Sequence, residues 1–131
     1  MANAEKIREV LDYITKHPEE WDQSIYARRT ECGSAYCVAG LAVVLNGHQL
    51  HWSRHEHLLE DLRKGIARHS FNAVRNGHEF DVVSIPWLAQ EELELSDNEA
   101  YQFFKPHNTI DRLWQLAGQF TDGEVKRSQQ W

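Results

Sequence analysis

The segment from Cys32 to Gly47 contains no charged side chain, and it restricts the fold more than any other part of the chain. Its apolar residues fall on every side of a helical wheel, so a helix here leaves no face for water and must be surrounded by other elements. Ser34 is the expected N-cap and Gly47 the expected stop, since serine accepts a hydrogen bond from a free N–H group and glycine tolerates positive φ. We therefore predict a buried central helix over about residues 34–46, in which small residues such as Gly40 let neighbouring backbones approach closely.

Amphipathic patterns predict further helices on both sides of this segment. The expected helices cover about residues 3–16, 55–67, 86–93, 97–104 and 109–117. Their starts are marked by Asn3, by Pro86, by a capping box from Ser96 to Glu99 and by Asn108 or Thr109. The chain is thus expected to be mainly helical.

Asn76 and Gly77 form the clearest turn signal, because both residues of a tight hairpin turn need positive φ. They separate two β-prone runs and predict a small hairpin at about 71–83, with a third strand near residues 50–52. The predicted fold class is mainly α (α+β), a single compact domain over 1–131 that ends in a frayed tail at about 122–131.

The charge balance limits the classes of partner. Fourteen basic residues stand against 20 acidic ones, a net charge of −6 with histidine neutral, so nucleic acid is not an expected partner. The N-terminal residues lack the apolar core of a signal peptide, and no apolar run reaches the roughly 20 residues that span a bilayer. We expect a cytoplasmic protein without a membrane-spanning segment, and the absence of a Gly-rich phosphate loop gives no reason to expect a nucleotide cofactor.

Four short pieces of the chain resemble a family of small, uncharacterised actinobacteriophage proteins that carry the motif C-G-[ST]-x-x-C-x-A-G. The motif positions here are Cys32, Gly33, Ser34, Cys37, Ala39 and Gly40. The other pieces are residues 17–21, 93–100 and 108–113. Where such relatives usually have glycine after leucine, this chain has Glu94. The resemblance implies a phage origin and the cytoplasm of an infected bacterium, and it implies no particular activity.

Cys37 is the residue with the clearest catalytic interpretation. A cysteine near the start of a helix gains thiolate character from free N–H groups and the helix dipole. A cysteine-dependent hydrolase would use Cys37 as nucleophile and His51 or His78 as base, with Asn108 or Asp81 orienting the base. The alternative is a small buried residue, which is how free cysteine most often occurs, and we favour it.

A metal site is a second interpretation of the same region. Cys32, Cys37, His51 and His55 nearly match the spacing of a two-cysteine, two-histidine zinc site, and His48 and His57 offer substitutes. An apolar helix is a poor place for a zinc ligand, so we expect no cofactor and keep structural zinc as an alternative. In a reducing cytoplasm the two cysteines are expected as separate thiols.

Five tryptophans are many for a chain of this length, and tryptophan serves both cores and interfaces. Trp21, Trp87 and Trp114 lie in apolar patterns and are expected in the core. Trp52 and Trp131 lie in polar surroundings and are the candidates for an exposed contact surface. The leading hypothesis is a non-enzymatic protein that binds a host or phage protein, with self-association left open; the hydrolase and the zinc-binding domain are the alternatives.

Overall fold

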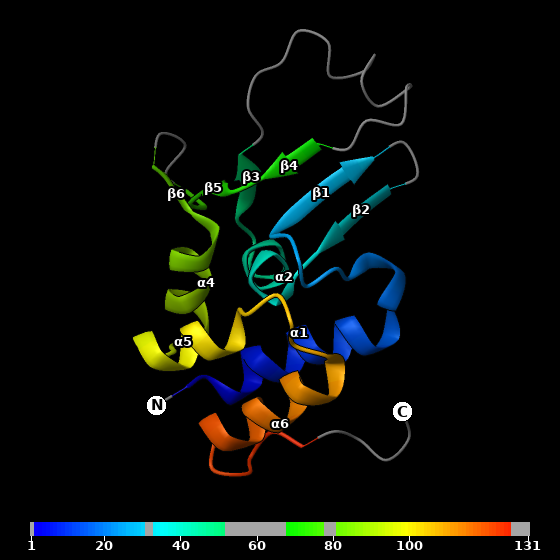
Figure 1. Cartoon of the computed structure of the whole chain (residues 1–131). Coiled ribbons are helices and arrows are strands. Elements are labelled where there is room, and N and C mark those ends of the chain that lie inside the picture. Colours follow the sequence, from blue (N-terminus) through cyan, green and yellow to red (C-terminus); the bar gives the residue numbers. More distant parts are fainter. Residues whose placement is uncertain (1, 31–32, 52–67, 78–80, 127–131) are drawn as a thin grey trace, which may run out of the picture.

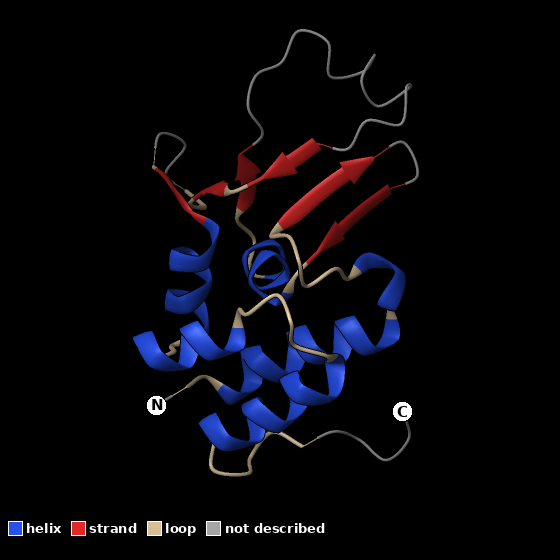
Figure 2. Cartoon of the chain, viewed as in Figure 1, coloured by secondary structure: helices blue, strands red, loops and turns tan. Residues whose placement is uncertain are grey.

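A computed structural model describes residues 2–30, 33–51, 68–77 and 81–126, and it has an α+β fold (Figure 1). The helices are α1 (Ala4–Lys16), the short 3-10 helix η1 (Pro18–Glu20), α2 (Val38–Leu45), α4 (Ile85–Leu93), α5 (Asp97–Phe103) and α6 (Ile110–Phe120). The strands are β1 (Ala27–Thr30), β2 (Gly33–Tyr36), β3 (Gln49–His51), β4 (Arg68–Ser70), β5 (Asn72–Val74) and β6 (Val82–Ser84). Figure 2 shows the strands gathered at one end of the molecule and the other helices at the opposite end, with α2 between them.

Helix α2 is the buried centre that the sequence predicts. All six residues from 38 to 43 are buried, and they share one hydrophobic core with apolar residues of α1, α4, α5 and α6. Gly47 has a φ of +86° just after the helix, as expected of the stop. A fully apolar helix is stable here because the other elements cover it on every side.

The predicted start of this helix, near residue 34, is wrong. Residues 33–36 form strand β2, which pairs antiparallel with β1 so that Ala27 lies opposite Tyr36. Cys37, and not Ser34, takes the N-cap position, with extended backbone angles of φ −83° and ψ −179°. Pairing with residues of β1, three to nine positions earlier in the chain, decides the conformation of this segment. The helical periodicity within the segment gives no sign of that pairing.

The predicted hairpin is confirmed. β5 and β6 pair antiparallel, with Ala73 opposite Val83. The predicted tight turn is wrong, because residues 75–81 separate the paired Val74 and Val82, and Gly77 (φ +83°) is at positive φ whereas Asn76 is not. The third strand is confirmed as β3, which pairs with the other edge of β5. A second three-stranded sheet, in the order β2-β1-β4, was not predicted, because its central strand lies in a polar stretch of the sequence.

The helix caps agree closely with the predictions. Asn3 Oδ1 accepts a hydrogen bond from Lys6 N, and both hydrogen bonds of the Ser96–Glu99 capping box are present. Thr109 caps α6, whereas Asn108 donates to two carbonyl groups at the end of α5. The helix predicted over 55–67 lies outside the described residues. None of the described helices combines the length and apolar character needed to cross a membrane.

The chain stays packed beyond the end of α6, where a frayed tail was expected from about residue 122. Val125 is 1% exposed, and its N–H group donates to Thr121 Oγ1 at 3.0 Å. The apolar side chain of Val125, five positions after the helix, returns to the core because a tight turn, with Asp122 and Gly123 at positive φ, reverses the chain. Residues 127–131 of the predicted tail lie outside the described part.

Candidate functional site

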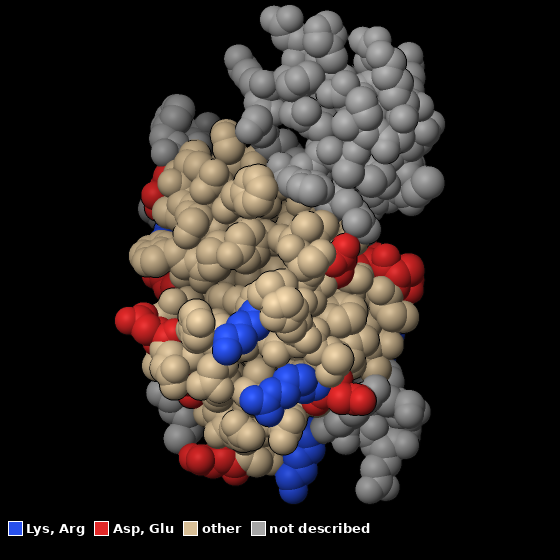
Figure 3. Space-filling model, viewed as in Figure 1, with Lys and Arg blue, Asp and Glu red and all other residues tan. Residues whose placement is uncertain are grey.

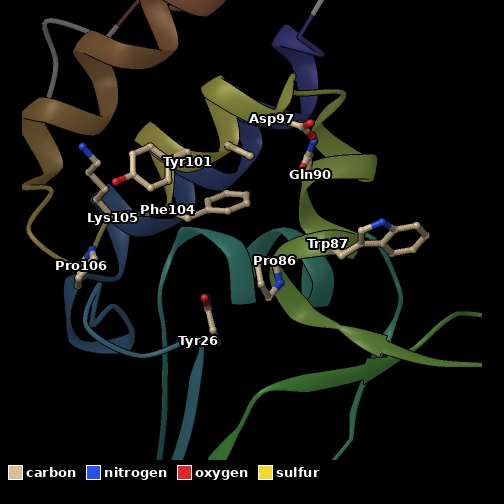
Figure 4. Close-up of a pocket in the computed structure, with 10 residues that line it drawn as sticks. Tyr26, Pro86, Trp87, Gln90, Asp97, Tyr101, Phe104, Lys105 and Pro106 are labelled. Carbon is tan, nitrogen blue, oxygen red and sulfur yellow. The ribbon is translucent and has the colours of Figure 1, made fainter.

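A groove crosses the surface where α4 and α5 meet the segment that follows α5 (Figure 4). Its larger hollow has a volume of about 440 Å3. Trp87 belongs to α4 and Tyr101 to α5, whereas Phe104 follows α5 and Tyr26 precedes β1. In Figure 4 the hydroxyl group of Tyr26 points toward the side of the hollow where Pro86 and Phe104 lie. The hollow thus joins parts of the chain that are distant in sequence.

A second hollow, of about 180 Å3, adjoins the first, since Tyr26, Phe104 and Pro106 line both. It is also lined by Ile25 and by Phe71, and Phe71 is the single residue between β4 and β5. We call the two adjoining hollows the aromatic groove, defined by Tyr26, Phe71, Trp87, Tyr101, Phe104 and Pro106. Together they form a longer, mainly apolar groove than either hollow alone.

The aromatic groove exposes large apolar side chains to solvent. Among the described residues, the exposed large hydrophobic side chains are Phe71 (60% exposed), Val82 (47%), Trp87 (52%) and Tyr101 (70%). All of these except Val82 line the groove. Figure 3 shows a broad area almost free of charged side chains on the face that includes α5. On soluble proteins, a cluster of exposed apolar side chains of this kind commonly marks a site of interaction with another molecule.

Trp87 corrects a sequence prediction that placed it in the core. Helix α4 buries Ile85, Leu88 and Leu93, and Trp87 lies two positions after Ile85, which points it to the opposite side of a helix with 3.6 residues per turn. The helix is apolar over most of its length, so the pattern alone does not show which face is covered. Trp114, by contrast, is 5% exposed and belongs to the core as predicted.

Two cations hold the exposed aromatic rings of the groove in place. The guanidinium carbon of Arg75 lies 5.2 Å from the centre of the Trp87 ring, and Arg75 is itself paired with Asp81 and Glu91, each at 2.9 Å. Lys105 Nζ lies 4.8 Å from the centre of the Tyr101 ring. Contacts of this kind at exposed sites contribute about 0.5–1 kcal/mol each, which favours the ring positions seen in the groove.

Gln23 connects the groove to the central helix, and nothing in the sequence singled it out. The side chain is buried, and its Oε1 atom accepts hydrogen bonds from Val38 N at 3.1 Å and from Trp21 Nε1 at 3.0 Å. Its Nε2 atom donates to the carbonyl oxygens of Phe103 and Lys105, at 3.3 and 3.2 Å. The Gln23 amide therefore binds the first N–H group of α2, which the Cys37 side chain does not cap, and it binds the backbone on both sides of Phe104.

Gly40 determines where Tyr26 lies. A Cβ atom built on Gly40 would lie 1.9 Å from the carbonyl oxygen of Tyr26, so only glycine fits between α2 and that carbonyl group. The same oxygen accepts a hydrogen bond from Cys37 N at 3.3 Å. The predicted close approach of backbones at Gly40 is confirmed, and it places the ring of Tyr26 at the groove.

The Cys37 thiol lacks the surroundings of a nucleophile. It is 1% exposed, and burial raises its pKa to about 11, although the N–H groups of Gly40 and Ala39 act in the opposite direction. Within the described residues it has no hydrogen bond to a histidine, and His51 is exposed on β3. His78 lies outside the described residues. The proposed orienting residues are otherwise engaged, since Asp81 pairs with Arg75 and Asn108 binds the end of α5.

Three of the six proposed zinc ligands and substitutes, Cys32, His55 and His57, lie outside the described residues. Trp52 and Trp131 also lie outside them. His48, a proposed substitute ligand, has both ring nitrogens occupied: Nδ1 accepts from Asn76 N at 2.8 Å, and Nε2 lies 2.8 Å from Glu92 Oε1. Glu92 Oε2 also binds Lys6 Nζ at 2.6 Å. His48 thus joins the hairpin turn to α4 and α1 and is not free to bind a metal.

One group of side chains in the described part of the chain has ligand atoms close enough together to hold a metal ion. His17, Glu19 and Glu20 each offer one such atom, and these lie within 4.8 Å of one another. All three side chains are at least partly exposed, and Glu20 already accepts a hydrogen bond from the Tyr13 hydroxyl group at 2.8 Å. Such clusters are common on acidic surfaces, so this one is no evidence for a metal.

Comparisons of the chain with models of protein families, with curated proteins and with solved structures gave no match. The phage resemblance suggested by the cysteine motif therefore stays a prediction. Within the described residues we argue function from the aromatic groove, because it combines a hollow shape with clustered, exposed aromatic side chains.

Proposed function

We propose that the protein acts by binding another protein through the aromatic groove. The observation that carries this proposal is the concentration of exposed Phe71, Trp87 and Tyr101 along one groove of a chain whose other described large hydrophobic side chains, Val82 excepted, are at least partly buried. Tryptophan and tyrosine contribute most to binding energy at protein interfaces, because they cover a large area at little entropic cost. The cation contacts of Trp87 and Tyr101 favour the ring positions that form the groove, which reduces the entropy lost on binding.

The chemistry of the groove favours a polypeptide over a small molecule. Small-molecule sites usually present a few convergent polar groups that orient the ligand. Here Gln90 Nε2 already donates to Leu95 O at 3.3 Å and to Asp97 Oδ1 at 2.8 Å. Among the described residues no buried side-chain nitrogen or oxygen atom lacks a hydrogen-bond partner. An elongated apolar groove without unpaired buried polar groups suits a run of side chains.

The resemblance of the cysteine motif to actinobacteriophage proteins supports a setting for this activity. On that basis the protein is a phage accessory protein in the cytoplasm of an infected bacterium, and its partner is a host or phage protein. A second copy of this chain is the remaining alternative for the occupant of the groove.

Affinity capture from lysate of a bacterial host, with and without infection, tests the proposal. The wild type is compared with Trp87→Ala and Tyr101→Ala, and Val82→Ala serves as the matched control because Val82 is exposed but outside the groove. We expect one or more proteins to be retained by the wild type and by Val82→Ala, and to be lost from both groove variants. Retention of the same proteins by all four, or of none by the wild type, would contradict the proposal.

A further inference from the structure

The two ends of the larger hollow carry opposite charges. Asp97, the first residue of α5, is exposed, and its carboxylate is held by the hydrogen bond from Gln90. Lys105 follows the end of α5 and is also exposed. Neither residue takes part in an ion pair within the described part of the chain, whereas Arg75 at the far side of Trp87 is paired twice. Figure 4 shows Asp97 and Lys105 on opposite sides of Phe104.

The separation of these charges sets a length scale. Asp97 and Lys105 are eight positions apart along a segment that is mostly helical, which corresponds to roughly 12 Å at a rise of 1.5 Å per residue. An extended chain advances about 3.3 Å per residue, so roughly three to four residues of it cover this distance. A helical segment would need about eight residues to cover the same distance, so the spacing of the two charges in a bound peptide distinguishes the extended from the helical conformation.

We infer that the groove binds an extended segment of the partner protein in which an apolar side chain lies between a basic and an acidic residue three or four positions apart. The apolar side chain enters the hollow between Pro86 and Phe104. The basic residue pairs with Asp97 and the acidic residue with Lys105. This inference rests on the proposed function and adds the chemical pattern and the register of the bound segment.

Selection of a phage-displayed library of random 12-residue peptides on the purified full chain tests the inference. We expect the wild type to enrich peptides with the pattern described, and replacement of either charged residue in such a peptide to weaken binding about threefold to tenfold at low salt, with a smaller effect at high salt. The double variant Asp97→Lys, Lys105→Asp is expected to prefer peptides with the two charges exchanged. The control, Glu5→Lys with Lys126→Asp, has the same net charge and leaves the groove unchanged, so it should select the wild-type pattern.

The outcomes separate this inference from the proposed function. Enrichment of the same apolar peptides by the wild type and the exchanged variant, with binding lost in Tyr101→Ala, would overturn the charge pattern and leave the groove as a binding site. Peptide binding that is unaffected by Tyr101→Ala would overturn the proposed function itself. Concentration-dependent dimerisation that Tyr101→Glu abolishes, measured by sedimentation, would show that a second copy fills the groove and would also overturn the inference. If the exchanged variant does not fold, Asp97→Asn and Lys105→Gln replace it, each losing the preference for one of the two charges.

Discussion

Replacing Gly40 by alanine tests the contact on which both the central helix and the groove depend. The added methyl group would lie 1.9 Å from the Tyr26 carbonyl oxygen, although real Cβ contacts are essentially never shorter than 3.0 Å, so one backbone must shift by about 1 Å. Neither moves easily, because α2 is buried and the Tyr26 oxygen is held by Cys37 N. Overpacking of this severity costs about 3 to 4 kcal/mol, of which about 1 kcal/mol is returned by the higher helix propensity of alanine.

We therefore expect Gly40→Ala to lower the free energy of unfolding by about 2 to 3 kcal/mol, equivalent to a fall in Tm of roughly 6–15 °C for a chain of this size. Urea and thermal unfolding, followed by circular dichroism and tryptophan fluorescence, measure it. Because α2 and the backbone of Tyr26 must move apart, Tyr26 changes its place relative to the core, and binding through the groove should weaken in the protein that remains folded. The position of Tyr26 in both hollows makes this second effect a direct consequence of the first.

Gly118→Ala is the matched control. Gly118 also lies within a helix, but a Cβ atom there would be 3.4 Å from its nearest neighbour, the Val125 carbonyl oxygen, which is an ordinary contact distance. Alanine at this position should leave stability unchanged or raise it by up to about 1 kcal/mol. A Gly40→Ala protein as stable as the wild type, or a Gly118→Ala protein equally destabilised, would refute the reasoning.

Three further changes test other features. Glu94 ends α4 at a φ of +55°, a conformation that glycine adopts more easily than glutamate. Glu94→Gly should therefore stabilise the fold by about 0.5 kcal/mol although it loses the hydrogen bond from Asn3, whereas Glu94→Ala should destabilise it by a similar amount. Urea unfolding measures both changes. Burial raises the pKa of Glu92, but hydrogen bonds from Lys6 and His48 outweigh this effect and lower the pKa overall. Glu92→Gln should therefore lower the free energy of unfolding by about 1 kcal/mol at pH 7. Urea unfolding across a pH series should show that the stability difference between wild type and variant shrinks as pH falls below about 4.5. Cys37, with a pKa of about 11, should resist iodoacetamide at pH 7 in the native protein and react after unfolding, as read by intact mass.

Each of these expectations has a clear contrary result. Equal stability of the glycine and alanine variants at Glu94 would show that positive φ is not strained there. The sign for Glu92 follows from a folded pKa below the unfolded one, so its contribution is present above the unfolded pKa and is lost as the carboxylate is protonated. A stability difference that grows toward low pH would therefore exclude the lowered pKa. Rapid native labelling of Cys37 would reopen the catalytic interpretation.

Features set by neighbouring residues could be predicted from the sequence. Asn3 and Ser96 cap their helices through side chains that bind backbone N–H groups three positions later, and Gly77 meets the conformational demand of its own turn. These interactions close within a few residues, so local chemistry decides them. The predicted start of the central helix was wrong because residues 33–36 form strand β2, which depends on pairing with β1.

The candidate site could not be predicted, because it depends on contacts between distant segments. The groove joins Tyr26 to Phe104 and Trp87, and no local pattern brings these residues together. The exposure of Trp87 depends on which face of an apolar helix the rest of the chain covers. The large number of tryptophans in the sequence favoured an interface, but it did not show where on the surface the interface lies.

The hydrogen bonds of Gln23 have a consequence for the order in which the protein is completed during synthesis. Its Nε2 atom donates to the carbonyl oxygens of Phe103 and Lys105, so this buried atom lacks both of these partners until the chain has been made as far as residue 103. A nascent chain generally folds as a unit once its long-range contacts are available. The start of the central helix and the groove wall at Phe104 therefore share one late contact, and we expect both to form only after the segment that follows α5 has been made.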